Sequence, residues 1–232
     1  MKTTTTILAL AGLTISSATT AATFDFVAMA DTPADPNYFG EMGFQSLNVT
    51  VDGLSLSATG TDTTDFLNYL ADPGAYQGDL DNEYAYLDSN TAGLGVCTSI
   101  NSNDQCDPSS DDNATADEVL ILAFSTEVTI SDLFFRDAKH NPINFGSGED
   151  FSLFIDGSYA GNIQYGSPLN QSFTGTIFAF SADDYNVASN SFTTDGDEFY
   201  ISNMSAVPVP AAVWLLGSAL AGLGSMRRRK DS

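Results

Sequence analysis

Short runs of alternating apolar and polar residues, separated by turn-forming residues, dominate residues 23–206. In the segment 47–58, which reads LNVTVDGLSLSA, apolar side chains occupy every second position on either side of the Asp52-Gly53 pair. A period of two buries one face of a strand, and Asp-Gly suits a two-residue hairpin because glycine tolerates positive φ. Helical periodicity is almost absent from the region. The pattern predicts an all-β domain, an antiparallel β-sandwich or jelly roll.

No fixed-period repeat and no interdomain linker interrupts residues 23–206, so the sequence predicts one domain there. A second hairpin turn is expected at Asp156-Gly157. Two segments, 62–69 and 181–187, are expected as short helical turns. The expected strands span 23–30, 44–51, 54–59, 84–88, 119–125, 128–136, 151–155, 158–165, 174–181 and 198–204.

The first 22 residues have the organisation of a secretory signal peptide. Lys2 gives a positively charged start, a short apolar run follows at 7–15, and Thr20 and Ala22 suit a cleavage site. The apolar run is too short for a membrane-spanning helix, although an uncleaved anchor is the alternative. We therefore expect export, with cleavage after Ala22 to within two residues.

An uncharged apolar run at 211–226 is followed by basic residues at 227–230. As a helix with a rise of ~1.5 Å per residue the run extends ~24 Å, against ~30 Å for a bilayer core. Flanking residues and local thinning can cover such a mismatch. The basic end would stay in the cytoplasm by the positive-inside rule. A single C-terminal transmembrane helix is therefore expected.

The segment VPVPAAVWLLGSALAGLGSMRRRK, within residues 207–232, resembles the PEP-CTERM sorting signal in its VPxPA form. A proline motif, an apolar helix and a basic cluster occur in that order. The resemblance implies recognition by an exosortase, a membrane-embedded processing enzyme of Gram-negative bacteria, with cleavage near 207–211. The protein would be held in the inner membrane until processing, and then reach the cell surface or the medium. The matching recognition residues are Val207, Pro208, Val209, Pro210 and Ala211, with Arg227, Arg228, Arg229 and Lys230.

A second resemblance covers residues 93–140. A GLGVC segment, a D-N-x-T-x-x-E turn and an F-R-D-x-x-H hairpin are similar to the core of many exported domains that carry this sorting signal. Ala116-Asp117 stands where a glycine before the glutamate would be more usual. The resemblance implies a β-sandwich jelly roll without an assigned activity. The matching residues are Asp112, Asn113, Thr115 and Glu118 in the turn, and Phe135, Arg136, Asp137 and His140 in the hairpin.

Cys97 and Cys106 are the only cysteines. In an exported chain an isolated pair is most simply one disulfide, and a zinc site is the alternative.

Residues 23–206 carry 29 acidic side chains against only Arg136 and Lys139, a net charge of −27. Such a surface repels nucleic acid and anionic lipid headgroups, so the sequence excludes nucleic acid as a partner. We expect Arg136 to pair with a nearby carboxylate, that of Asp132, Asp137 or the 111–112 loop.

Acidic clusters could supply the oxygen ligands that calcium prefers. Two lie at 79–83 and 195–198, and the third lies beside the cysteines. None matches an EF-hand loop. No cofactor is required, and the sequence leaves a structural calcium ion and plain solvated loops as alternatives. The third cluster comprises Asp104, Asp107, Asp111, Asp112 and Asn113.

Enzymatic chemistry has little support in the sequence. His140 is the only histidine and no G-x-S-x-G elbow is present, so an exported hydrolase is the weakest hypothesis. The sequence favours a non-enzymatic protein of the cell surface or extracellular matrix. The alternative is a carbohydrate-binding module that takes extracellular polysaccharide on aromatic side chains. Its candidate residues are Tyr69, Tyr76, Tyr84, Tyr86, Tyr159 and Tyr165.

Overall fold

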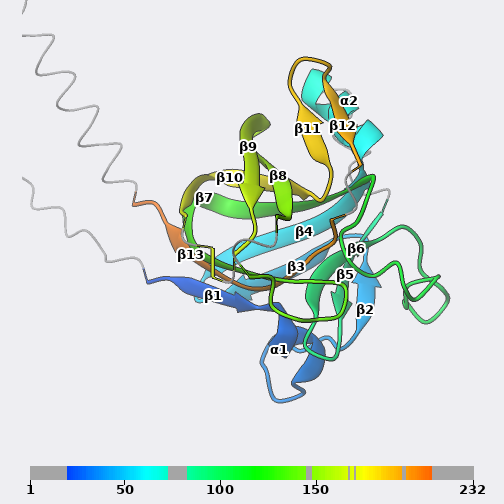
Figure 1. The fold of residues 1–232 in the computed structure, drawn as a ribbon. Coiled ribbons are helices and arrows are strands. Elements are labelled where there is room, and N and C mark those ends of the chain that lie inside the picture. The colour runs from blue at the N-terminus through cyan, green and yellow to red at the C-terminus, as the bar shows by residue number, and fades with distance from the viewer. Residues whose placement is uncertain are drawn as a thin grey trace, which may run out of the picture. The chain divides into compact units, whose positions relative to one another are not determined.

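The computed structural model describes residues 20–72, 83–144, 148–166, 168–169, 171–194 and 197–210. Thr20–Val209 forms a compact unit whose regular structure is mostly antiparallel β-sheet (Figure 1). The all-β prediction is therefore confirmed. Within the described residues, no helix is long and apolar enough to cross a membrane. The expected transmembrane segment 211–226 lies outside the described residues.

One sheet contains eleven strands in the order β2-β5-β6-β13-β7-β10-β8-β9, with β1 paired to β13 and the β3–β4 hairpin paired to β7. A separate hairpin pairs β11 with β12. The strands are β1 (Ala22–Asp25), β2 (Met42–Phe44), β3 (Leu47–Val51), β4 (Leu54–Asp62), β5 (Tyr84–Asp88), β6 (Gly93–Cys97), β7 (Glu118–Arg136), β8 (Asp150–Ile155), β9 (Ser158–Gln164), β10 (Phe173–Ser181), β11 (Asp184–Asn186), β12 (Ser191–Thr193) and β13 (Tyr200–Pro208), and the helices are α1 (Phe26–Asp31) and α2 (Thr63–Ala71).

Strand β7 joins the two halves of the sheet. Its residues 118–124 pair with β4, its residues 128–136 pair with β13, and β10 pairs with both parts. The sequence predicted two strands here because polar residues interrupt the apolar pattern at 125–127. The structure instead has one strand that changes its partner at this interruption.

The first part of strand β7, residues 118–124, is covered on both faces. Leu120 and Leu122 belong to the main core, whereas Val119 and Ile121 belong to a smaller apolar cluster. Helix α2 and the β11–β12 hairpin lie close together over that second cluster (Figure 1). Burial on both faces explains why the segment VLILA reads as a continuous apolar run rather than an alternating one.

Both predicted Asp-Gly hairpin turns are confirmed. Asp52 and Gly53 have φ of 50° and 82°, and Asp156 and Gly157 have φ of 49° and 76°. Two consecutive positive φ values are those of a type I′ turn, which matches the twist of the flanking strands. The predicted helical turn at 62–69 is also confirmed, as α2, whose N-cap Asp62 accepts a hydrogen bond from the Asp65 amide.

Other local predictions were wrong. The strand expected at 23–30 ends at Asp25, whose carboxylate accepts a hydrogen bond from the Ala28 amide and starts α1. The helical turn expected at 181–187 contains strand β11, because Tyr185 pairs with Phe192 of β12. Strands β2, β6 and β12 were missed. These strands are short, and each is stabilised by the strand that it pairs with: β2 and β6 pair with β5, β6 also pairs with β13, and β12 pairs with β11. Their own residues carry little strand signal.

Both ends of the compact unit overlap segments that the sequence assigns to processing signals. Ala22, the last residue of the expected leader, is buried in β1 and pairs with Ala206. Val207 and Pro208 of the expected sorting motif belong to β13 and pair with β7. The Val209 amide then donates a hydrogen bond to the Glu127 carbonyl.

Candidate functional site

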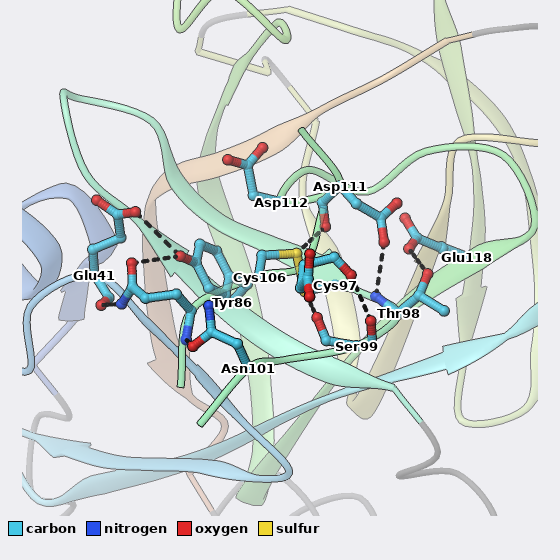
Figure 2. The surroundings of a disulfide bond; sticks show 12 residues. Glu41, Tyr86, Cys97, Thr98, Ser99, Asn101, Cys106, Asp111, Asp112 and Glu118 are labelled. Carbon is cyan, nitrogen blue, oxygen red and sulfur yellow. Dashed lines mark hydrogen bonds between the residues drawn. A yellow bond between two sulfur atoms is a disulfide. The ribbon is translucent and has the colours of Figure 1, made fainter. Parts of the chain in front are cut away.

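The disulfide between Cys97 and Cys106 is present, as the sequence predicted (Figure 2). Cys97 ends β6, and Cys106 forms an isolated bridge with Ile100, which brings the two Cα atoms to 5.9 Å. Both cysteines are buried, in a small cluster with Tyr86. The bond therefore closes the polar loop 98–105 at its base.

This disulfide loop is docked on strand β2. The Gly43 amide donates to the Asp104 carbonyl, and the Gln105 side-chain amide donates to the Glu41 carbonyl. The Tyr86 hydroxyl donates to the Glu41 carboxylate at 3.2 Å, and Figure 2 shows Glu41 and Tyr86 on one side of the disulfide. The loop is thus a fixed part of the surface.

Strand β6 reaches the disulfide through a tightly packed glycine segment. A Cβ on Gly95 would lie 2.3 Å from the Asp112 carbonyl oxygen, and a Cβ on Gly93 would lie 2.5 Å from the Ile201 carbonyl oxygen. Gly93 also has a φ of 121°, which side chains other than glycine rarely adopt. The GLGVC segment therefore lets β6 lie directly against β13 and the 111–113 segment.

The structure does not bring together the acidic residues that the sequence grouped as a calcium site. Within the described residues, no three carboxylate or imidazole ligand atoms lie within 4.8 Å of one another. Asp111 accepts from the Thr98 amide, Asp112 accepts from the Tyr200 hydroxyl, and the Asn113 amide donates to Glu198. Asp104 and Asp107 are exposed. Of the other two clusters, Asp79, Asp81 and Asp195 lie outside the described residues.

The zinc alternative depends on the chemical state of the two cysteines. Their sulfur atoms lie close to a carboxylate oxygen of Asp111, which is the kind of grouping that could hold a metal ion. The two sulfur atoms are joined to each other, however, so neither is a free thiolate. Because a cysteine binds zinc as a thiolate, the disulfide removes the zinc alternative at this position.

Two buried glutamates lie beside the disulfide. Glu118 is 3 % exposed and starts β7, and Glu83 is 7 % exposed and bridges Gly60 of β4. The Glu118 carboxylate accepts from the Thr115 amide at 2.9 Å and from the Thr98 hydroxyl at 3.3 Å. Figure 2 shows the carboxyl groups of Asp111 and Glu118 side by side, the first directed at the Thr98 amide and the second at the Thr98 hydroxyl.

The pKa values of both glutamates are raised. Burial raises the pKa of Glu118 to about 9, and the negative charges of Glu83 and Asp111 add to the effect of burial. Burial likewise raises the pKa of Glu83 to about 8, with Asp62 and Asp111 as the leading charges. In the absence of a bound cation both carboxyl groups are therefore largely protonated at neutral pH.

The single histidine has no free ring nitrogen. His140 Nε2 lies 3.1 Å from Asp88 Oδ2, and His140 Nδ1 lies 3.0 Å from the Asn90 carbonyl oxygen. Burial raises the pKa of Asp88 to about 6, an effect that Asp112 increases and His140 opposes. A general base needs one ring nitrogen directed at a nucleophile, so this arrangement fits a structural role.

Arg136 does not form the carboxylate pair that the sequence predicted. Its Nη1 donates to the His140 carbonyl oxygen at 2.6 Å, across the turn that leads to Asn141. The Arg136 guanidinium group thus stabilises the turn that carries His140, whose ring in turn contacts Asp88.

A mostly apolar pocket of about 300 Å³ lies on the outer face of the sheet, between α2 and strands β4, β7 and β10. Phe66, Tyr69 and Phe154 supply its aromatic side chains, and Ser57 and Thr59 supply hydroxyl groups. Its lining contains no charged residue. The sequence did not indicate this pocket, because its lining comes from strands and a helix that only tertiary packing brings together.

Of the tyrosines that the sequence proposed as a sugar platform, only Tyr69 and Tyr159 among the described ones pack against the cluster that contains Phe66 and Phe154. Tyr69 lines the apolar pocket, and Tyr159 contacts Phe154 and Tyr185 next to it. Tyr86 and Tyr165 are buried, Tyr84 is half-buried, and Tyr76 lies outside the described residues.

No family model, no curated protein and no solved structure matches this chain. Its function therefore has to be inferred from its residues and their geometry.

Proposed function

We propose that this chain is an exported, non-enzymatic protein of the bacterial cell surface or extracellular matrix, processed by an exosortase at its C-terminal tail. The observation that carries the proposal is the position of the VPVPA motif, which begins within the last strand, β13, and leads directly into the apolar run and the basic residues. The leader-like N-terminal segment and the buried disulfide agree with export.

We infer that the two halves of the sheet form the layers of a β-sandwich. Leu56 of β4 and Leu94 of β6 come from different halves, yet both belong to the same apolar core. A shared core between two packed layers is the usual arrangement for antiparallel sheets of this size.

Strand pairing restricts where the tail could be cut. Residues up to Val209 are hydrogen-bonded to β7 or to Glu127, so cleavage before Val209 would remove the end of a paired strand. Cleavage after Pro210 would leave the sheet intact. The exported form should therefore retain Val209 and end at about residue 210 or 211.

Intact-mass measurement of the exported protein tests this proposal. In a host with an exosortase we expect a form that lacks residues 1–21 or 1–22 and everything after about 211. A host without the enzyme should give a form that still contains Met226 and Arg227. The same unprocessed tail in the exosortase host would contradict the proposal.

A matched pair of variants separates motif recognition from folding. Pro210→Ala changes the motif beyond the last strand, so it should block processing while leaving the thermal unfolding midpoint unchanged. Val187→Ala changes an exposed side chain outside the motif and should be processed normally.

The apolar pocket favours a second candidate, a carbohydrate-binding module. Sugars present an apolar ring face and a hydroxyl edge, which match the aromatic and hydroxyl groups of the pocket. Because the domain is strongly anionic and the pocket is uncharged, a neutral polysaccharide fits better than an acidic one.

Affinity electrophoresis through gels containing neutral or acidic polysaccharides tests the second candidate. Neutral polysaccharides should retard the protein, and Tyr69→Ala should restore its mobility. Tyr38→Ala, which removes an exposed aromatic side chain away from the pocket lining, serves as the control. Equal mobility in every gel would remove this candidate.

A further inference from the structure

The two buried glutamates beside the disulfide have no counter-charge among the described residues. Within the described part of the chain no salt bridge joins Glu83 or Glu118 to a basic side chain, and the imidazole of His140 lies against Asp88 instead. Arg136, one of the two basic residues of the domain, is directed to a carbonyl oxygen of another turn. The charge of the glutamates must therefore be balanced by protons or by a cation.

One oxygen of this pair is buried without a hydrogen-bond partner. Glu83 Oε2 is inaccessible to solvent and accepts no hydrogen bond, and the residue as a whole is 7 % exposed. It faces a negative environment, because the carboxylates of Asp62, Asp111 and Asp117 all raise its pKa. A buried oxygen without a donor costs free energy unless something binds it.

The positions of the surrounding groups follow from the strand pairing. Asp62 of β4 pairs with Glu118 of β7, and Glu83 bridges Gly60 two residues earlier on β4. Tyr84 pairs with Cys97, which places Thr98 across from Glu83 at the ends of β5 and β6. Thr98 is exposed and its hydroxyl contacts Glu118, so this residue connects the buried Glu118 carboxyl group to solvent (Figure 2).

We propose that Glu83 and Glu118, together with the Thr98 hydroxyl, bind a hard divalent cation where the sheet meets the disulfide loop. Carboxylate and hydroxyl oxygens are the ligands that Ca²⁺ and Mg²⁺ prefer. No three carboxylates converge within 4.8 Å among the described residues, so the cation keeps water molecules in its remaining positions. Two carboxylates with several waters is a usual environment for such an ion. The site differs from the exposed loop cluster around Asp104 and Asp107.

The cation would connect two parts of the fold. Glu118 begins the central strand β7, whereas Thr98 follows the disulfide cysteine Cys97. Asp111, whose carboxylate accepts from the Thr98 amide, adds negative charge on the solvent side and attracts cations to the site.

Calorimetric titration of CaCl₂, and separately MgCl₂, into the EDTA-stripped exported protein tests the proposal. We expect one binding site and a higher thermal unfolding midpoint than in NaCl of matched ionic strength, since the matched salt accounts for general screening. Glu83→Gln and Glu118→Gln keep the side-chain shape and should each weaken binding about tenfold or more.

The double variant Asp104→Asn, Asp107→Asn removes two exposed charges from the disulfide loop and should bind the cation as the wild type does. Loss of binding in this variant, with binding retained in Glu83→Gln, would move the site to the loop and overturn the proposal. No heat of binding and no midpoint shift beyond the NaCl control would overturn it as well. Neither result bears on tail processing, which is read by mass.

Discussion

At the scale of single residues, buried acids distinguish this domain from a simple solvated acidic protein. Glu118 occupies the first position of β7 and is buried, and Leu120, two residues further along the strand, lies fully inside the main core. An ionised carboxylate in such a place costs free energy, so the group keeps its proton unless a cation replaces it. The stability of the domain around Glu118 should therefore depend on pH.

Glu118→Gln tests this linkage in EDTA-containing buffer. Wild-type Glu118 keeps its proton in the folded state up to a pKa of about 9, whereas the unfolded chain loses it near the ordinary pKa of 4.5. The contribution of the protonated Glu118 carboxyl group to the free energy of unfolding is therefore fully present below pH 4.5 and is lost as the pH rises toward 9. Glu83 acts in the same direction.

Urea unfolding at several pH values between about 5 and about 9 measures the effect. We expect the free energy of unfolding to fall less steeply with pH in Glu118→Gln than in the wild type, so the variant is the more stable protein at the alkaline end. Asp104→Asn, at an exposed position, should follow the wild-type curve. Parallel curves for Glu118→Gln and the wild type would contradict the raised pKa of Glu118 in the folded protein.

At the scale of elements, the disulfide and strand β6 act together. The loop 98–105 contains mostly polar residues and contributes few side chains to the apolar clusters, with Ile100 packed beside the cysteines. Its position depends on the covalent closure at Cys97 and Cys106 and on hydrogen bonds to β2. Strand β6 holds Cys97 in place because its glycines allow close contact with neighbouring backbone.

Removing the disulfide should destabilise the domain. In the chain-entropy treatment, a closed loop of this length contributes about 2.7 kcal/mol, so Cys97→Ser with Cys106→Ser should lower the free energy of unfolding by about that amount. Urea denaturation measures it, and wild-type protein under reducing conditions should show the same loss. A change well below about 1 kcal/mol would mean that the hydrogen bonds to β2 alone hold the loop.

Gly95→Ala should destabilise more than an ordinary glycine substitution. The new Cβ would lie 2.3 Å from a backbone oxygen of Asp112, so either β6 or the 111–113 segment must move. Gly53→Ala is the control, because nothing lies within 4 Å of its Cβ and only its φ of 82° opposes the change. That control should cost about 1–2 kcal/mol.

Thermal unfolding of both variants checks this comparison. The expected order of midpoints, from highest to lowest, is wild type, then Gly53→Ala, then Gly95→Ala. A Gly95→Ala midpoint at or above that of Gly53→Ala would show that β6 accommodates a side chain.

At the scale of the whole molecule, repulsion between like charges is the most prominent electrostatic effect. Residues 23–206 carry a net charge of −27, because their 29 acidic side chains are offset only by Arg136 and Lys139. Net charge of this size favours solubility and opposes compaction. The apolar core, which takes residues from both halves of the sheet, has to overcome this repulsion.

Salt should therefore stabilise the domain. At about 10 mM salt the screening length is about 30 Å, whereas at about 1 M it is about 3 Å, so repulsion between surface acids largely disappears. We expect the thermal unfolding midpoint to rise with NaCl over this range, by several degrees. A midpoint that is unchanged or lower in high salt would show that repulsion contributes little to the stability.

Much of the fold could be predicted because its signals are local. The alternation in 47–58 and the Asp-Gly pairs predicted two hairpins, both of which are present. The cysteine pair predicted the disulfide. Strand β6 and the continuity of β7 could not be predicted, since a glycine-rich strand is stabilised by its partners and a strand's change of partner leaves no pattern in its own residues.

By itself, the sequence determined the class of fold, the two hairpins, the disulfide and the acidic character of the domain. Each of these depends on neighbouring residues or on composition, which the linear order of a chain already contains. The tertiary structure decided which acids are buried, which pocket forms under α2, and which groups His140 and Arg136 contact. These depend on contacts between separate segments of the chain, such as the hydrogen bond from the Thr98 hydroxyl to Glu118. Nothing in the local sequence distinguishes Glu83 and Glu118 among the 29 acids of the domain, and it is packing that buries them.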